Sequence, residues 1–253
     1  MENISVKQID VAGDTHIGLV RGNNEDGFVY RVSDSEPNSM VAVADGIGGH
    51  EGGDIASGLC LRTVTTMWRD SNLPATTSKQ RLRRFLPNAI GKANRLIFNI
   101  NKSCGIQHPM GTTVVAGVFS PTEITISHAG DSRCYRLRNG VLNSLTRDHS
   151  YVSDLVKKKL ISAEEARNHP FSHIISRSVG PVRNLDLETR TFILKPRDRY
   201  LLCTDGLTNH VNDFEIETIL YDAPDPQSAV RNLLYAALRG GGEDNITVLC
   251  VFL

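Results

Sequence analysis

Strand-like and helical segments follow one another along this chain in an order that limits its fold more than any other feature. Val-rich, strand-like stretches come in runs, at residues 5–13, 27–32, 40–44, 112–119, 123–129, 134–140, 141–146, 186–194, 199–204 and 246–253. Helical stretches come in two paired blocks, at about 53–68 with 78–103 and at about 212–221 with 225–239. A doubly wound nucleotide-binding fold is not expected, because it needs strict alternation of strand and helix. We predict an α+β sandwich with mainly antiparallel β-sheets.

No repeat, low-complexity tract or Pro/Gly-rich linker divides the 253 residues, which indicates a single domain over residues 1–253. Within it, residues 150–176 interrupt the strand pattern with short, charged, helical pieces. In the helical stretch 78–103, apolar residues recur at helical spacing, and Pro87 is a candidate site for a kink or a break.

Charge and hydropathy exclude several classes of partner. The 28 Lys and Arg residues balance 28 Asp and Glu residues, so the net charge gives no overall attraction to nucleic acid or to an anionic membrane. No apolar run approaches the roughly 18 residues that span a bilayer, and the start MENISVKQID lacks the apolar centre of a signal peptide. We therefore expect a soluble, cytoplasmic protein that binds neither nucleic acid nor membrane. The five scattered cysteines form no CxxC pair, which favours buried, reduced thiols.

Two aspartates stand at the ends of neighbouring strand-like stretches. Asp26 directly precedes the stretch 27–32, and Asp45 directly follows the stretch 40–44, with the turn-like sequence SDSEPNS between the two stretches. In an antiparallel hairpin, the start of one strand lies beside the end of the other. Asp26 and Asp45 should therefore meet at one edge of a sheet.

Three further acids occupy comparable places. Asp205 follows the stretch 199–204 and Asp244 precedes 246–253, so pairing of these strands would bring both acids together; Asp131 follows a third stretch. An isolated Asp-Gly pair is best explained as a turn. Five acids at strand ends favour a divalent-cation site instead, because clustered carboxylates repel one another unless a cation neutralises them. All-oxygen ligands suit Mg²⁺ or Mn²⁺ and make zinc a poor candidate.

Eight short motifs then occur in a recognisable order. They are the runs 21–26 (RGNNED), 41–57 (VAVADGIGGHEGGDIAS), 111–113 (GTT), 129–140 (AGDSRCYRLRNG), 145–150 (LTRDHS), 176–180 (SRSVG), 201–208 (LLCTDGLT) and 243–248 (EDNITV). Together they resemble the metal-dependent protein phosphatases of the protein phosphatase 2C (PPM) class, and most of all its compact bacterial members. The resemblance covers nearly the whole chain. It implies two antiparallel sheets flanked by pairs of helices, a helical flap at 150–176, and a two-metal site at one edge of the sandwich.

The resemblance also implies a set of metal ligands. Asp45 would bridge two metal ions, and Gly46 would offer its carbonyl oxygen to the first of them. Asp205 and Asp244 would bind the second ion. Asp131 matches the aspartate that helps to hold a third, weaker ion in bacterial relatives. The implied cofactors are Mn²⁺ or Mg²⁺, with two ions in the core site.

Four other residues receive roles from the same comparison of motifs. Glu25 and Asp26 match the acidic pair of the family; Asp26 would orient the metal-bound water and Glu25 would lie in the outer shell of the site. Arg21 matches the arginine that grips substrate phosphate in some members. His50 has two interpretations, a general acid or phosphate-orienting group and a structural cap in a glycine turn.

The remaining histidines have structural interpretations. His149, in the motif LTRDHS, is expected to fix a loop, and His169 and His173 are expected to be surface or packing residues of the flap. Cys203 and Thr204 stand where many relatives have Ser before the aspartate, which we expect to change little, since neither is a family metal ligand.

The implied activity is hydrolysis of phosphoserine and phosphothreonine in proteins by a metal-activated water. The expected partners are phosphorylated proteins, including a serine/threonine kinase whose action the enzyme reverses, and the expected state is a monomer. Two alternatives remain open at this point. One is a catalytically silent binding or sensory module, and the other is a phosphatase for small phosphoesters or for a sigma-factor regulatory switch.

Overall fold

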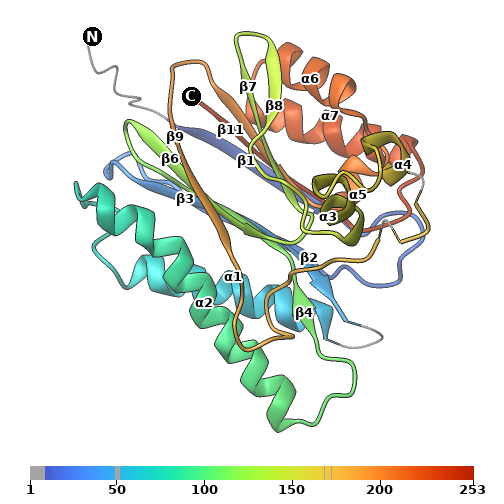
Figure 1. Cartoon of the computed structure of the whole chain (residues 1–253). Helices are drawn as coiled ribbons and strands as arrows, with labels where there is room; N and C mark the ends of the chain where they lie inside the picture. The colour runs from blue at the N-terminus through green and yellow to red at the C-terminus, as the bar shows by residue number, and fades with distance from the viewer. Residues whose placement is uncertain (1–8, 49–51, 168, 172) are drawn as a thin grey trace.

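Two antiparallel β-sheets packed face to face form the centre of the molecule (Figure 1). The computed structural model describes residues 9–48, 52–167, 169–171 and 173–253. The first sheet has the order β1 (Asp10–His16), β11 (Ile246–Phe252), β10 (Arg199–Cys203), β7 (Arg133–Arg138) and β8 (Val141–Ser144). The second has the order β2 (Asp26–Arg31), β3 (Ser39–Ile47), β5 (Val114–Phe119), β6 (Glu123–Ala129) and β9 (Glu188–Ile193), and β4 (Gly111–Thr112) also pairs with β3.

The layer between the sheets is apolar. Val41 and Val43 of β3 contribute to it from one sheet, and Leu249 and Val251 of β11 contribute from the other. Each of these side chains is fully buried. The continuous apolar run of β3 follows from this arrangement, because the alternate residues Ala42 and Ala44 point to the opposite face and are buried there by helices.

Helix pairs cover both outer faces of the sandwich (Figure 1). Helices α1 (Gly53–Arg69) and α2 (Lys79–Ser103) pack on the β3 side, and α6 (Asp213–Asp222) and α7 (Pro226–Arg239) pack on the β11 side. The predicted α+β sandwich of two mainly antiparallel sheets, flanked by pairs of helices, is confirmed.

Helix α2 runs through Pro87 as one element, so the break considered from the sequence does not occur. Proline removes one backbone hydrogen bond, but Leu86 and Ile90 on either side of it are fully buried in the core beneath α2. Burial of such side chains contributes about 1.5–3 kcal/mol each, which is comparable with the cost of the proline. Tertiary packing therefore keeps the helix continuous.

Residues 150–176 form the flap that the sequence predicted. It contains two short helices, α3 (Tyr151–Lys157) and α4 (Ala163–Arg167), and lies outside the two sheets. Its two ends are held together, because Ser150 and Ile175 form an antiparallel bridge and the N–H of Tyr151 donates to the carbonyl of Ile174 at 2.8 Å.

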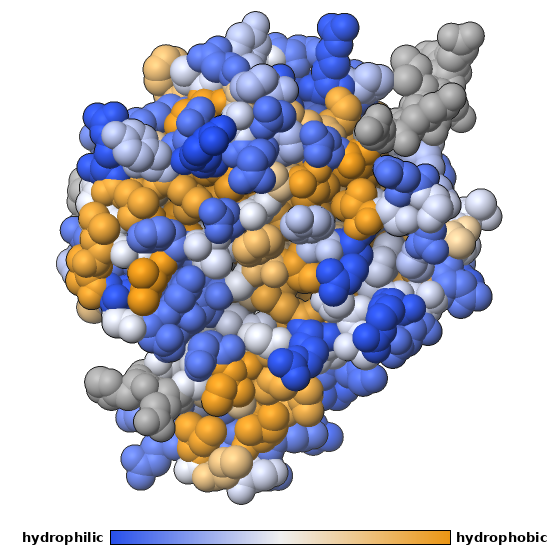
Figure 2. Space-filling view, turned by 180° about the vertical axis from the view of Figure 1, so that it is seen from behind, coloured by the Kyte–Doolittle hydropathy of each residue, from blue (hydrophilic) through white to orange (hydrophobic). Residues whose placement is uncertain are grey.

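The surface mixes hydrophilic residues with several hydrophobic patches on the face opposite to that of Figure 1 (Figure 2). Within the described ranges, no helix combines the length and the apolar character needed to cross a membrane. Of the five free cysteines, four are buried, as expected from the sequence, and Cys104 is exposed.

Candidate metal centre

Asp26 and Asp45 are directly opposite each other in the pairing of β2 with β3. Asp26 is the first residue of β2, and Asp45 lies near the end of β3, so the hairpin brings the two carboxyl groups to one edge as the sequence predicted. Burial raises the pKa of Asp26 to about 7, and burial and Asp26 together raise the pKa of Asp45 well above its ordinary value.

The other three acids come to the same edge from the second half of the chain. Asp205 begins the short helix α5 (Asp205–Thr208) two residues after the end of β10, and Asp244 lies two residues before β11. Asp131 lies in the turn between β6 and β7. All three carboxyl groups, with Asp26, help to raise the pKa of Asp45 by repulsion. The sandwich therefore gathers the five predicted acids into one cluster, which we call the acidic cluster.

The acidic cluster suits a divalent cation. One carboxylate oxygen of Asp26 and one of Asp131 are buried without a hydrogen-bond partner among the described residues. Burial raises the pKa of Asp131 to about 7, and repulsion from Asp205 and Asp148 acts in the same direction. Burial and Asp244 raise the pKa of Asp205. Crowded, buried carboxylates whose oxygens lack hydrogen-bond partners destabilise the fold when no cation is bound. Hard divalent cations bind such groups of oxygen ligands.

Two threonines hold two of the acids: Thr113, which lies in the motif GTT, and Thr204, which was expected only to replace a Ser without consequence for the metal ligands. The hydroxyl of Thr204 donates to Asp26 Oδ2 at 2.8 Å, and it accepts the N–H of Thr247 at 2.9 Å. The Asp45 N–H donates to Thr113 Oγ1 at 3.1 Å, and the Thr113 N–H donates to the Asp45 carbonyl at 2.8 Å. The sequence offered a positional signal for Thr204 alone, which directly precedes Asp205; Thr113 lies in the motif GTT, which contains no acid.

Asn245 holds three backbone groups of the loop between β1 and β2 beside the acidic cluster. Its side-chain oxygen accepts the N–H of Glu25 at 2.8 Å, and its amide nitrogen donates to the carbonyls of Ile17 and Asn23, both at 2.9 Å. The side chain is nearly fully buried. A single amide thus fixes the loop that leads into β2 next to Asp244, a function that its place in the motif EDNITV did not reveal.

Gly46 is required where the cluster meets α1. A Cβ atom added to Gly46 would lie 2.2 Å from the carbonyl oxygen of Gly53 and 2.7 Å from that of Glu25. The Gly46 N–H donates to the same Glu25 carbonyl at 3.1 Å. Any larger residue would therefore push the start of α1 and the acidic loop away from β3.

Arg21 and Glu25 border the acidic cluster. Arg21 Nη2 donates to Asp244 Oδ2 at 2.8 Å, and the arginine side chain is 56% exposed, so its guanidinium also faces solvent. Burial and the neighbouring Asp54 raise the pKa of Glu25. His50, the candidate acid or turn cap, lies outside the described residues.

A cleft of about 880 Å³ opens beside Asp131 and Asp205. The flap forms one wall, and α5 with the start of α6 forms the opposite wall. His173 of the flap lines the cleft and is exposed, whereas His169 is half-buried near the rings of Tyr151 and Phe171. The flap thus lies directly beside the acidic cluster.

Comparison with known proteins identifies the family. Residues 12–232 match the family model described as protein phosphatase 2C. The chain is 37% identical over 238 residues to the serine/threonine phosphatase stp of Listeria monocytogenes serotype 4b. The alignment covers 94% of this chain and 93% of that protein.

Solved structures agree. The crystal structure of the Mycobacterium tuberculosis serine/threonine phosphatase PstP/Ppp matches with a TM-score of 0.85 and 33% identity, covering 97% of this chain and 98% of that one. A structure of the catalytic domain of PstP in complex with 2 manganese ions matches with a TM-score of 0.83 and 32% identity, covering 96% and 97%. With this agreement of sequence, fold and acidic cluster, the chain belongs to the protein phosphatase 2C family, among its bacterial PPM-type serine/threonine phosphatases.

Proposed function

We propose that the chain hydrolyses phosphoserine and phosphothreonine in proteins at the acidic cluster. The observation that carries the proposal is the convergence of five acids from both sheets, two of which have a buried oxygen without a hydrogen-bond partner in the described ranges. A phosphomonoester dianion cannot approach such a cluster unless cations reverse its charge. A phosphatase that depends on divalent metal ions is therefore the activity that best fits this site.

In this proposal Asp45 and the carbonyl of Gly46 hold the first ion, and Asp45, Asp205 and Asp244 hold the second. Asp131 holds a third, weaker ion, and the metal is Mn²⁺ or Mg²⁺. Two divalent cations would neutralise the phosphate and lower the pKa of bound water, so that a nucleophile is available at neutral pH. The manganese in the related PstP structure supports this metal class.

The side chains around the ions have separate tasks. Asp26 is fixed through Oδ2 by Thr204, and its Oδ1, which accepts no hydrogen bond from the part of the chain that the structure describes, would accept one from the attacking water. Arg21 would present its exposed N–H groups to the phosphate oxygens, since a guanidinium binds two such oxygens at once. Glu25 would support the site from the outer shell. His50 keeps both of its interpretations.

The proposal extends to the protein that carries the phosphate. The cleft between the flap and α5 has room for a polypeptide segment next to the acidic cluster. We propose that residues 1–253 act as one domain with a flap at 150–176. We further propose that the enzyme works as a cytoplasmic monomer and that its substrates include a serine/threonine kinase.

The test is phosphate release from a phosphothreonine peptide with Mn²⁺, with Mg²⁺ and with a chelator. We expect hydrolysis only with metal, and Asp205→Asn should lower kcat by about a hundredfold or more, as expected for lost electrostatic stabilisation of a few kcal/mol. Asp222→Asn, at an exposed position at the end of α6, is the matched control. Peptide binding without phosphate release would instead identify a silent binding module, and near-native turnover by Asp205→Asn would refute the metal assignment.

A further inference from the structure

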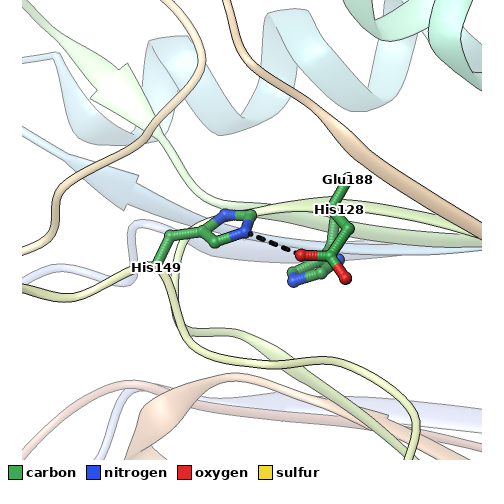
Figure 3. A group of neighbouring side chains, drawn as sticks. All are labelled: His128, His149 and Glu188. Carbon is green, nitrogen blue, oxygen red and sulfur yellow. Dashed lines mark ion pairs between the residues drawn. The ribbon is translucent and has the colours of Figure 1, made fainter. Parts of the chain in front are cut away.

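Two stacked histidines, His128 and His149, form a group with Glu188 (Figure 3). The group lies beside the Asp131 turn, because His149 is hydrogen-bonded to Gly130. His128 belongs to β6 and His149 follows β8; their ring centroids are 4.5 Å apart and the ring planes differ by 14°. The residues are only 3% and 6% exposed. Glu188 of β9 points toward the pair, and its Oε2 atom lies 3.5 Å from His149 Nε2 (Figure 3).

His149 binds both polar groups of the Gly130 backbone. The backbone N–H of His149 donates to the Gly130 carbonyl at 2.9 Å, and the backbone N–H of Gly130 donates to the ring atom Nδ1 of His149 at 3.3 Å. Gly130 has φ +110°, and an added Cβ would lie 2.6 Å from the side chain of Thr113. The residue after it is Asp131 of the acidic cluster. His149 therefore contributes two hydrogen bonds to the conformation that presents Asp131.

The protonation state of His149 follows from this contact. Because Nδ1 accepts a backbone N–H, the neutral ring carries its proton on Nε2, which faces Glu188. Burial lowers the pKa of His149 to about 4, and His128 and Arg177 act in the same direction. The ring is thus neutral at physiological pH, as the hydrogen bond from Gly130 requires.

The same three side chains do not form a second metal site, although two histidines and a carboxylate suit zinc in composition. A metal ion must lie in the plane of each imidazole that binds it, and rings stacked face to face cannot both meet this condition. In addition, His128 Nε2 bonds to the carbonyl of Arg147 at 2.9 Å, and Nδ1 of His149 is taken by Gly130. The group is a hydrogen-bonded support.

Two further contacts connect this support to the active edge and to the flap. Ser132, after Asp131, shares a 2.7 Å hydrogen bond with Thr113, which in turn bonds to the backbone of Asp45. On the other side, the N–H of Ser176 at the end of the flap donates to the His149 carbonyl at 2.8 Å. His149 therefore lies where the Asp131 turn and the base of the flap meet.

We propose that His149 is a positioning residue: its Nδ1 atom and backbone N–H fix Gly130 so that the Asp131 carboxylate is held in place for its metal ion. The inference rests on the proposed function only in assigning a metal ion to Asp131. It predicts that loss of the Nδ1 acceptor weakens the metal ion at Asp131 and leaves the ions at Asp45, Asp205 and Asp244 in place.

The experiment is calorimetric titration of the metal-free protein with Mn²⁺ alone. Asp131→Asn should abolish the weakest binding phase. His149→Leu, which removes the acceptor, should weaken that phase about tenfold, equivalent to about 1.4 kcal/mol. His149→Asn places an amide oxygen near the position of Nδ1 and should retain the phase within about twofold, less than ~0.5 kcal/mol. Glu188→Gln, which keeps an acceptor oxygen toward the ring, is the control and should bind Mn²⁺ like the wild type.

The outcomes separate positioning from general stability. In the Asp131→Asn background, His149→Leu should change Mn²⁺ binding no further. If His149→Leu lowers the melting temperature but keeps every binding phase, or if His149→Asn behaves like His149→Leu, the proposal is refuted. An unaltered weak phase in Asp131→Asn refutes it too. Should the Leu variant not fold, His149→Gln, which leaves the δ position without an acceptor, replaces it. Binding is measured without turnover, so a wild type that binds Mn²⁺ as predicted but hydrolyses no phosphopeptide contradicts the proposed function alone.

Discussion

Thr204 offers the sharpest test of how the acidic cluster is organised. Its side chain is fully buried, and its hydroxyl group donates to Asp26 Oδ2 while accepting the N–H of Thr247. Thr204→Val keeps the shape of the side chain and removes both hydrogen bonds. Asp26 Oδ2 then loses its hydrogen-bond donor, and Asp26 Oδ1 already has no partner among the described residues. The buried N–H of Thr247 in β11 loses its acceptor.

The two losses should appear in different measurements. An unsatisfied buried N–H costs about 1–3 kcal/mol, so we expect the free energy of unfolding to fall by about 2 kcal/mol. A hydrogen bond to a charged group contributes about 1.5–3 kcal/mol. If Asp26 orients the attacking water, loss of the hydrogen bond that fixes Asp26 should lower kcat by about 10- to 100-fold. Thr204→Ser keeps the hydroxyl and loses one methyl group, which should cost about 1 kcal/mol of stability and leave kcat within about threefold.

Urea unfolding measures the loss of stability. The loss of turnover is measured as kcat on a phosphothreonine peptide at saturating Mn²⁺, at a temperature where circular dichroism shows that each variant is folded. Turnover by Thr204→Val within about twofold of the wild type, a barrier change below ~0.5 kcal/mol, would refute the role of Thr204 in orienting Asp26. Equal loss of turnover in the Ser and Val variants would also contradict it, because only one of them lacks the hydroxyl.

Three further predictions follow from the site and its surroundings. Arg21→Ala should raise KM for a phosphopeptide more than it lowers kcat, because contact with the dianion exists before the reaction; steady-state kinetics with an unchanged KM would contradict this. Replacing the exposed lysines 157–159 of the flap by Ala should alter the turnover of phosphoproteins. Hydrolysis of p-nitrophenyl phosphate should stay within about threefold of the wild type, a change in the activation barrier below ~1 kcal/mol. Equal loss on both substrates would show that the flap supports the metal site. Because the pKa of His149 is lowered in the folded protein, this side chain takes up a proton in the unfolded chain at a higher pH than in the folded one. It should therefore make the free energy of unfolding fall as pH decreases from about 6.5 to 4. In urea unfolding, His149→Asn should show a smaller fall over this range, and a fall identical to that of the wild type would refute the assignment.

The sequence by itself determined the parts of the site that depend on one pair of strands. A short connection joins the two stretches, and Asp26 and Asp45 stand at their outer ends. Once the stretches form a hairpin, antiparallel geometry leaves the two acids opposite each other. The paired blocks of helices and the grouped strands also determined the α+β sandwich, because each apolar face needs a partner and few arrangements provide one.

Only the tertiary structure decided which segments meet across layers. Alternation along a strand shows which residues face inward, but it does not show which side chain of the other sheet stands opposite. The hydrogen bond from Thr204 to Asp26 joins residues 178 positions apart, and the buried amide of Asn245 meets Glu25 across 220 positions.

The same limit explains His149 and Pro87. The motif LTRDHS predicted a residue that fixes a loop, and the fold specified that this loop is the Asp131 turn, 19 positions earlier. For Pro87, local propensity favoured a kink or a break, whereas the buried neighbours Leu86 and Ile90 hold the helix in one piece. Local preferences amount to a few kcal/mol, and packing energies of the same size, available only when the layers assemble, decide the outcome.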